Sequence, residues 1–338
     1  MIDLIVAGGG PAGLATALNG ARAGLEVVVI EPRGGAIDKA CGEALMPHTV
    51  AQLERLGVRP HGNPLRGITY LDGRRSVGVT FRSGTGRGVR RTALHTALAD
   101  AVTAAGVRVV QGEVADVTQD ALSVHACGLR ARYLAAADGL HSPIRRSMGL
   151  EAPSGGSRRW GIRRHVHVAP WTDHVEVHWG RDSEAYVTPV ADDCVGIAIL
   201  TSRRGGFDSH FGDFGALADR VRGCPHDRDR AAGPLRQRVR ARAAGRVLLV
   251  GDAAGYVDAL TGEGLGIAFG AAELLVACVA TDRPGDYDRQ WRRMSRRYRL
   301  LTAGLLRASS HASVRSKIVP AAVALPAVFA RLVNQLAE

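Results

Sequence analysis

A glycine turn near the start of the chain, Gly8-x-Gly10-x-x-Gly13, constrains the fold more than any other feature. It follows an apolar run at residues 2–7 and precedes a helix-like segment at residues 14–23. A second apolar run at residues 27–30 ends on Glu31, whose carboxylate is placed to hold two ribose hydroxyls. The order strand, turn, helix, strand and acidic residue predicts a βαβ unit that binds a dinucleotide.

Each position of the turn has a physical role in this unit. Gly8 permits the tight turn out of the first strand, Gly10 lets a pyrophosphate approach the backbone, and Gly13 lets the helix pack closely on the strand. The N-terminus of the helix that follows offers free amide groups and the positive end of the helix dipole to the phosphates. The turn alone leaves open whether the dinucleotide is NAD or FAD.

Hydrophobic periodicity predicts a second, β-rich module later in the chain. We expect helices at residues 48–56 and 91–98, a hairpin at 67–71 and 76–81, and a strand at 107–110. A period of two from residue 160 onward predicts antiparallel strands at 164–168, 174–179, 185–190 and 195–200. A buried strand at 246–250 then ends on Gly251-Asp252, and helices follow to the C-terminus.

Composition excludes several classes of protein. The net charge of +12 comes almost wholly from arginine, and no aromatic–basic motif supports nucleic-acid binding. The five cysteines form no C-x-x-C pair, so neither a disulfide framework nor a metal site is expected, and a reducing cytoplasm fits. No window of 18 apolar residues exists to span a membrane. The expected partner is a small-molecule substrate.

Three separated stretches make one constellation: the glycine turn with Glu31, the segment Asp138-Gly139 with Arg145, and Gly251-Asp252. Together they resemble the FAD-binding fold of the aromatic hydroxylases (group A flavoprotein monooxygenases) and of the related geranylgeranyl reductases. The resemblance covers residues 1 to about 285. Alone, Asp138-Gly139 and Gly251-Asp252 are also typical of ordinary turns, and their joint order is what favours FAD.

The resemblance implies an α/β fold like that of p-hydroxybenzoate hydroxylase, with a Rossmann-like FAD-binding domain and an inserted antiparallel β-sheet that binds substrate. The FAD-binding domain would be discontinuous, formed by residues 1–65, 86–155 and 244–285. The substrate domain would comprise residues 66–85 and 156–243, and a helical C-terminal segment residues 286–338. No second glycine turn of this type follows a strand, so NAD(P)H, the implied reductant, has no domain of its own.

The resemblance also implies roles for individual residues. Glycine-turn residues would hold the pyrophosphate and Glu31 the adenosine ribose, Asp252 would bind the ribityl chain, and Tyr186 and Pro189 would wall the substrate pocket. A helix opening at residues 262–266 would direct amide groups at the flavin and stabilise negative charge on it. The full set of implied cofactor residues is Gly8, Gly10, Pro11, Ala12, Gly13, Glu31, Arg33, Arg91, Val114, Asp138, Gly139, Gly251, Asp252, Gly262, Gly264 and Leu265. An exposed surface position is the alternative for Arg33.

The reaction implied first is NAD(P)H-dependent hydroxylation of a small apolar or aromatic metabolite, such as a polyketide, isoprenoid or lipid. The alternative is reduction of an alkene, as in the geranylgeranyl reductases. Two stretches favour that branch: Lys39-Ala40-Cys41-Gly42-Glu43 and the run Thr261-Gly262-Glu263-Gly264. In the first of them Cys41 is a candidate catalytic residue beside the flavin and Glu43 a candidate proton carrier. The alternatives are a small loop residue and a solvated carboxylate.

The C-terminal segment leaves two interpretations open. Arginines at residues 289–299 precede an apolar stretch at 318–329 that contains Pro320 and Pro326. The stretch either packs on the main body of the protein or rests on a membrane face, which would suit a lipid-like substrate. The expected location is therefore the cytoplasm, with peripheral membrane contact as the second interpretation.

Overall fold

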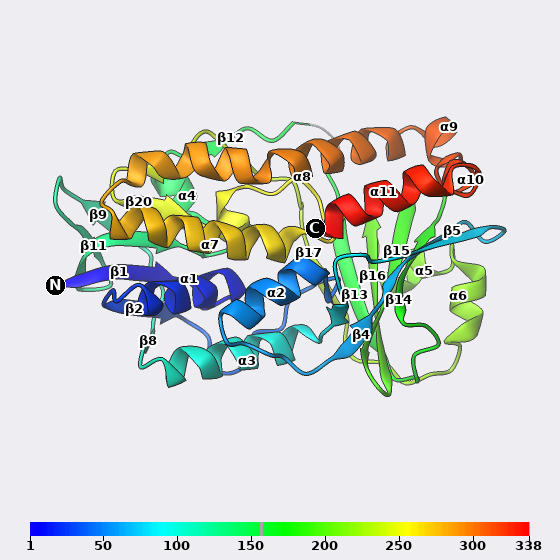
Figure 1. The fold of residues 1–338 in the computed structure, drawn as a ribbon, viewed down its shortest axis with the longest axis horizontal. Coiled ribbons are helices and arrows are strands. Elements are labelled where there is room, and N and C mark those ends of the chain that lie inside the picture. Colours follow the sequence, from blue (N-terminus) through cyan, green and yellow to red (C-terminus); the bar gives the residue numbers. More distant parts are fainter. Residues whose placement is uncertain (156–157, 338) are drawn as a thin grey trace.

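A computed structural model describes residues 1–155 and 158–337 of the chain. Residue 156, where the expected substrate segment resumes, and residue 338, where the C-terminal segment ends, lie outside the described residues. Figure 1 shows a first sheet with α1, α3 and α7 in one half of the molecule and a second sheet with α5 and α6 in the other. The long helix α8 runs along both halves. The α/β fold class with a helical C-terminus is confirmed.

The first sheet contains the glycine turn and follows the order β19-β20-β11-β1-β2-β8, with β10 and β9 attached to β11. The central strand β1 pairs in parallel with β2 and with β11, and β11 pairs in parallel with β20. Its strands are β1 (Ile2–Ala7), β2 (Val27–Glu31), β8 (Arg108–Gln111), β9 (Val117–Gln119), β10 (Val124–Ala126), β11 (Leu129–Ala136), β19 (Ala243–Ala244) and β20 (Val247–Leu249). The carboxyl ends of β1, β11 and β20 therefore meet at one edge, where ligands of such sheets bind.

The helices mostly match those expected from the sequence. The helix expected at 91–98 extends six residues further, and the C-terminal apolar stretch forms two helices. The elements are α1 (Pro11–Arg22), α2 (Pro47–Arg55), α3 (Arg91–Ala104), α4 (Pro143–Ser147), α5 (Phe207–Phe211), α6 (Gly215–Arg220), α7 (Gly264–Ala280), α8 (Tyr287–Ser309), α9 (Ala312–Arg315), α10 (Ile318–Ala324) and α11 (Pro326–Ala337), with 3-10 turns η1 (Gly251–Ala254) and η2 (Pro284–Asp286).

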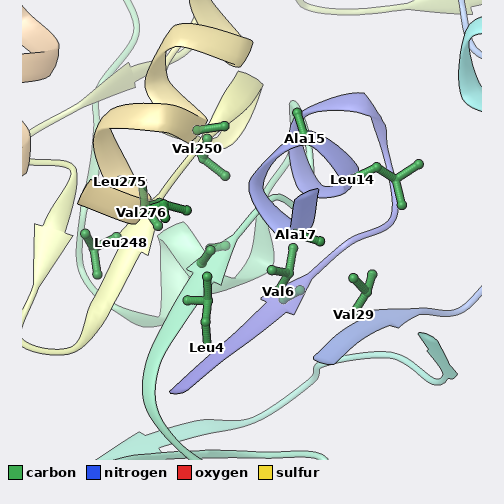
Figure 2. Close-up of a cluster of buried hydrophobic side chains, with 14 of the residues drawn as sticks. Leu4, Val6, Leu14, Ala15, Ala17, Val29, Leu248, Val250, Leu275 and Val276 are labelled. Atoms are coloured by element: carbon green, nitrogen blue, oxygen red, sulfur yellow. The ribbon is translucent and has the colours of Figure 1, made fainter. Parts of the chain in front are cut away.

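The core of the first half lies between its sheet and helices α1 and α7. Figure 2 shows Leu4 and Val6 of β1 meeting Ala17 of α1 and Leu275 and Val276 of α7. Each of these side chains is at most 4% exposed. Burying a Leu or Val side chain contributes about 1.5–3 kcal/mol, so this cluster stabilises the edge of the sheet that carries the glycine turn.

The second sheet follows the order β17-β13-β16-β15-β14-β5-β6. Its strands are β5 (Gly67–Leu71), β6 (Ser76–Thr80), β13 (Trp160–Val166), β14 (His174–Trp179), β15 (Ser183–Ala191), β16 (Cys194–Thr201) and β17 (Arg230–Ala232). The expected antiparallel order holds except between β5 and β14, which pair in parallel. The early hairpin therefore joins the later strands in the same sheet, which periodicity could not reveal.

Two small sheets connect these halves. One contains β3 (Ala44–Leu45), β7 (Gly86–Gly88) and β4 (Asn63–Leu65), and the other contains β12 (Glu151–Ala152) and β18 (Arg238–Val239). Strand β7 passes so close to β15 that a Cβ at Gly88 would lie 1.8 Å from the carbonyl oxygen of Pro189. Glycine is required there because two backbones meet.

The C-terminal helices pack one face against the second sheet. Phe329 and Val333 of α11 and Val319 of α10 belong to an apolar cluster with Val79 of β6 and Val177 of β14. Between the helices the chain bends at Leu325. No single helix in residues 1–155 and 158–337 has both the length and the hydropathy to cross a bilayer, although the segments 312–324 and 326–337, bent by 103°, have both when taken together.

Candidate active site

The glycine turn lies against the ends of two strands and leaves open space on its outer side. Gly8 has φ +110°, and a Cβ there would lie 2.5 Å from the carbonyl oxygen of Ala137 at the end of β11. A Cβ at Gly13 would lie 1.9 Å from the carbonyl oxygen of Gly8. At Gly10, by contrast, a Cβ would meet nothing within 4 Å. The turn is therefore closed toward the protein and open where a pyrophosphate is expected.

Helix α1 presents free amide groups to this open space. It begins at Pro11, and its N-cap residue, Gly10, has no side chain that could cap the helix. The first-turn amides of a helix have no partner inside the helix, so they are available to an anion. Two segments, Asp138-Gly139 and Gly251-Asp252, are the aspartate turns of the site. Ala12 packs against the second of them, since a Cβ at Gly251 would lie 2.7 Å from the Cβ of Ala12.

Glu31 ends β2 beside the turn and is held there by two donors. Its Oε2 accepts a hydrogen bond from the Gly9 amide at 2.7 Å, and its Oε1 accepts one from Nε of Arg33 at 2.6 Å. Burial raises the pKa of Glu31, but the hydrogen bonds from Arg33 and Gly9 outweigh it, so the net pKa is below the ordinary value. The carboxylate is ionised and acts only as an acceptor, as ribose hydroxyls require.

The two arginines predicted to contact the nucleotide differ in environment. Arg91 at the start of α3 is 7% exposed, and its Nη1 is buried without a hydrogen-bond partner. Arg33 is exposed and folds back on Glu31. The Val114 side chain is 7% exposed and packs in the hydrophobic core, and its role at the cofactor stays a prediction.

Asp138-Gly139 and Gly251-Asp252 lie at the ends of the neighbouring strands β11 and β20. Oδ2 of Asp138 accepts the Ile144 amide at 3.1 Å, whereas its Oδ1 is buried without a partner. Burial raises the pKa of Asp138. The Lys39 amino group lies over this turn, because a Cβ at Gly139 would be 3.5 Å from its Nζ. Lys39 belongs to the stretch at residues 39–43 that contains Cys41, called the cysteine loop below. The structure thus brings this loop to the predicted cofactor residues.

Asp252 opens onto a cleft beside α7 and α8. The cleft is lined by Asp252, Tyr256, Gly264, Trp291 and Tyr298 among others. Helix α7 begins at Gly264 without a side-chain cap, which leaves its first amides, including that of Leu265, free to face a ligand. Gly262 precedes this helix with φ +73°, a conformation that favours glycine.

The Cys41 thiol lies in the loop between β2 and β3, close to Arg91. Its Sγ accepts a hydrogen bond from the Glu43 amide at 3.4 Å. Burial and the charge of Glu43 raise the pKa of Cys41, with Arg91 opposing only in part. The side chain is therefore a protonated thiol at neutral pH, which is poorly suited to acting as a nucleophile.

Glu43 is neither a solvated carboxylate nor open to the cleft. Its side chain is fully buried at φ +61°, with Oε1 accepting the Arg91 amide at 2.8 Å and Oε2 lying 2.7 Å from Nε2 of His165. Because a carboxylate can only accept, Nε2 of His165 donates to Glu43. The other ring nitrogen, Nδ1, lies 2.8 Å from Nη1 of Arg163 and 3.3 Å from Oδ2 of Asp227. With donors at both oxygens, Glu43 fixes the cysteine loop on α3 and β13, and its predicted role as a proton carrier stays untested.

Tyr186 and Pro189 lie on β15, away from the cleft at Asp252. The Tyr186 hydroxyl donates to the carbonyl oxygen of Leu260 at 2.9 Å, in the loop before α7. Pro189 is buried against β7. Between them, Thr188 donates from Oγ1 to the carbonyl oxygen of Gly42 at 2.8 Å. Strand β15 therefore holds both the loop that contains Gly42 and the loop before α7. The role of Tyr186 and Pro189 at the substrate stays a prediction.

Arg145, which belongs to the predicted constellation, and His95, which was not singled out from the sequence, hold the parts of the site together. Arg145, fully buried, donates to the carbonyl oxygens of Leu140 at 3.0 Å and of Ala253 at 3.3 Å, and so joins the two aspartate turns. His95 on α3 contacts the carbonyl oxygen of Gly9 through Nε2 at 3.0 Å. Burial lowers the pKa of His95, so it is a neutral donor. Arg145 follows Asp138-Gly139 closely in the sequence, so its contact with Leu140 is local. No sequence signal indicated its contact with Ala253, which lies after β20.

The residues present fit FAD. Open space at Gly10, the uncapped start of α1, and the unpartnered buried atoms Nη1 of Arg91 and Oδ1 of Asp138 provide room and polar groups for a dinucleotide along one sheet edge. Residues 1–205 match the protein family described as the FAD binding domain. The chain belongs to this family. It is an FAD-dependent oxidoreductase.

Several known proteins are similar to this flavoprotein. It is 29% identical over 326 residues to a menaquinone reductase of Mycolicibacterium smegmatis, covering 86% of this chain and 79% of the relative. It is 27% identical over 334 residues to digeranylgeranylglycerophospholipid reductase 1 of Methanothermobacter thermautotrophicus, covering 85% and 81%. A shorter match, 46% identical over 55 residues, joins 16% of the chain to 14% of a para-nitrophenol 4-monooxygenase of Pseudomonas.

Solved structures share the fold of this flavoprotein at low identity. The flavin-dependent halogenase CmlS has a TM-score of 0.78 at 20% identity, over 89% of this chain and 63% of CmlS. A flavoprotein/dehydrogenase from Cytophaga hutchinsonii has a TM-score of 0.77 at 17% identity, over 90% and 85%. These matches establish the fold alone. The family match and the similar reductases, by contrast, confirm the predicted relation to the hydroxylase and geranylgeranyl reductase superfamily.

Proposed function

We propose that this flavoprotein is a reductase that saturates a carbon–carbon double bond of an apolar, isoprenoid-like small molecule, with NAD(P)H as electron donor. The position and protonation of the Cys41 thiol carry the proposal. Burial keeps the thiol protonated, and its loop contacts the predicted cofactor residues through Lys39, beside Gly139, and through Glu43, beside Arg91. The menaquinone and digeranylgeranylglycerophospholipid reductases among its relatives support reduction over hydroxylation.

Saturating an alkene requires a hydride on one carbon and a proton on the other. FAD, when bound and reduced by NAD(P)H, supplies the hydride. Sγ of Cys41 supplies the proton, the S–H bond breaks as the new C–H bond forms, and solvent water returns the proton to sulfur. Neutral thiol is the required starting form, and burial beside the Glu43 carboxylate favours it.

The cofactor and substrate roles are divided between the two halves of the molecule in this proposal. Residues 1–65, 86–155 and 244–285 bind FAD, with Arg91, Asp138 and Asp252 directed at it. Residues 66–85 and 156–243 form the substrate side. Apolar side chains of β5, β14 and β15, with Tyr186 hydrogen-bonded to the loop before α7, support an apolar substrate.

Hydroxylation of an aromatic or other apolar compound is the second candidate. The 46% identical match to a para-nitrophenol 4-monooxygenase favours it, although that match spans only 55 residues. Both candidates use FAD and a nicotinamide, and they differ in whether O2 is consumed. Alkene saturation requires a proton donor at the reacting carbon, and in this proposal that donor is the Cys41 thiol. Loss of this thiol is therefore expected to slow saturation more than oxygen insertion.

Oxygen dependence and product mass test the proposal directly. The purified flavoprotein is incubated with NADPH or NADH and a panel of menaquinones, geranylgeranyl lipids and phenols, with and without O2. The proposal expects a product heavier by two hydrogens that forms without O2. A product heavier by one oxygen that forms only with O2 would establish the second candidate instead.

Matched cysteine variants test the carrying observation. Cys41→Ala should lower the rate of product formation by about a hundredfold, in the range typical of general acid catalysis, while flavin reduction by NAD(P)H is retained. Cys224→Ala is the control, since Cys224 is also partly buried but lies in the far half of the molecule, near α6. Equal turnover by Cys41→Ala and the wild type would contradict the proton-donor role.

A further inference from the structure

A run of six consecutive apolar residues is exposed where α10 turns into α11. Residues 323–328 read Val-Ala-Leu-Pro-Ala-Val, and all six are exposed. Val323 is 41% exposed, Leu325 58% and Val328 53%. Water-facing apolar runs of this length are unfavourable unless another apolar phase covers them.

The exposed run is rigidly mounted on the protein. Phe329 and Val333 of α11 pack on the second sheet, so the helix buries one apolar face and exposes another. Arg315 of α9 anchors the approach to α10, since it donates to the carbonyl oxygens of Gly180 at 2.8 Å and Ser183 at 2.7 Å and pairs with the buried Glu184. The exposed corner is therefore preformed and needs no rearrangement to be available.

Exposed large apolar side chains concentrate on the C-terminal helices. Among the described residues, those outside this part of the chain are scattered: Met1, Val109 and Leu122. The remainder fall within α8 to α11 and their connections: Met294, Leu300, Val314, Val323, Leu325, Val328 and Leu332. Isolated exposed apolar residues are ordinary on protein surfaces, whereas a concentration in one segment marks an interaction surface.

The charged side chains within residues 289–337 are all basic. Residues 289–337 include ten arginines and lysines and neither aspartate nor glutamate. Arg307, Lys317 and Arg331 are exposed next to the apolar residues, and none of the ion pairs found in the described part of the chain involves them. Apolar side chains bordered by unpaired cations match the boundary between acyl chains and anionic headgroups.

We propose that the corner at residues 323–328, with Leu332 beside it, inserts into the surface layer of an anionic phospholipid bilayer, while Lys317 and Arg331 contact its phosphates. The bend of 103° between the helices favours lying in the surface layer over crossing it. A second copy of the chain is disfavoured as occupant, because two such basic faces would repel each other. The proposal concerns membrane binding and does not depend on the reaction catalysed.

Vesicle co-sedimentation tests the proposal with the full flavin-loaded protein. Binding is expected to vesicles of phosphatidylcholine mixed with phosphatidylglycerol and to be much weaker to phosphatidylcholine alone. Raising the salt from about 0.1 M to about 1 M shortens the Debye length from about 10 Å to about 3 Å and should release most of the protein. Absence of binding to the anionic vesicles at low salt would overturn the proposal.

Matched variants locate the binding surface. Leu325→Asp with Val328→Asp should weaken vesicle binding by more than about tenfold, because apolar area no longer enters the bilayer. Lys317→Glu and Arg331→Glu should each weaken it by at least about fivefold. Leu122→Asp and Arg108→Glu, at exposed positions on the first half, are the controls and should bind as the wild type does. Flavin content and melting temperature should be unchanged in all of them.

Two outcomes would reassign the corner and so contradict the proposal. Self-association in sedimentation velocity that Leu325→Asp abolishes, without vesicle binding, would assign it to a second copy of the chain. Vesicle binding that is unchanged in Leu325→Asp with Val328→Asp, and in Lys317→Glu, would place the membrane contact elsewhere on the protein. Both measurements are independent of turnover, so neither is affected by failure of the proposed reaction.

Discussion

Oε2 of Glu43 lies 2.7 Å from Nε2 of His165, with the two side chains 0% and 3% exposed. The pair joins the cysteine loop to the second sheet, 122 positions along the chain. Removing one partner of a buried, hydrogen-bonded pair leaves the other unsatisfied. Glu43→Ala should therefore lower the free energy of unfolding by about 3 kcal/mol, measured by denaturant titration.

The exposed Glu54 on α2 provides the control for this change. Glu54→Ala should alter the free energy of unfolding by less than about 0.5 kcal/mol. Glu43→Gln preserves most of the shape of the pair and should retain flavin. If Glu43→Gln were as stable as the wild type but inactive, the sequence-based role of Glu43 as a proton carrier would be supported over the anchoring role.

Two glycines of the opening turn should separate folding from flavin binding. Gly13→Ala places a Cβ 1.9 Å from a backbone oxygen and should cost about 3 kcal/mol of stability. Gly10→Ala meets nothing within 4 Å, so the flavin-free protein should keep its stability within about 0.5 kcal/mol. It should nevertheless purify with little or no FAD, because the added methyl group occupies the path of the pyrophosphate. Wild-type flavin content in Gly10→Ala would show that the pyrophosphate lies elsewhere.

The two candidate nucleotide arginines should differ in their contribution to flavin affinity. Nη1 of Arg91 is buried and unpartnered, so a charge-assisted hydrogen bond to the cofactor would contribute about 1.5–3 kcal/mol, or at least tenfold in Kd. Arg33 is exposed and already pairs with Glu31, so Arg33→Met should change Kd by less than about fivefold. Fluorescence titration of flavin-free Arg91→Met and Arg33→Met with FAD measures both. The reverse ranking would contradict the assignment of Arg91.

Asp258 should make stability depend on pH in mildly acidic solution. Burial raises the pKa of Asp258 to about 6 from its ordinary 3.8, and Arg159 offsets this only in part. Between about pH 4 and pH 6 the folded chain keeps a proton that the unfolded chain has lost, so stability falls as pH rises, by about 3 kcal/mol in all. Above about pH 6 this contribution is constant.

Asp258→Asn should remove that part of the pH dependence. The amide keeps an acceptor for Arg159 and for the Leu260 amide but has no proton to lose. The difference in unfolding free energy between wild type and Asp258→Asn, measured by urea titration across this range, should therefore slope with pH. Asp116→Asn, at an exposed position, is the control. A difference that does not vary with pH would show that folding leaves the pKa of Asp258 unchanged.

Local patterns determined the cofactor half of this protein. The glycine turn, Glu31, Asp138 and Asp252 stand at or just after strand ends, and this order predicted a dinucleotide-binding α/β unit. FAD itself was implied by the resemblance of the three stretches to known flavoprotein families, and the family match supports it. The apolar positions at residues 48–56 and 91–98 likewise predicted α2 and α3, and α7 was expected as a helix opening at residues 262–266. The parallel pairing of β5 with β14 was not predicted, since strand direction depends on partners far apart in sequence.

Only the tertiary structure decided how the candidate site is arranged. Glu43 became a buried anchor because His165 and the Arg91 amide, from two other elements, both donate to its carboxylate. Arg145 became the link between two aspartate turns through carbonyl groups more than a hundred positions away. The sequence by itself determined which residue types stand after which strands. Burial, charge pairing and the exposed corner at residues 323–328 arise from contacts between distant segments, which spacing along the chain does not encode.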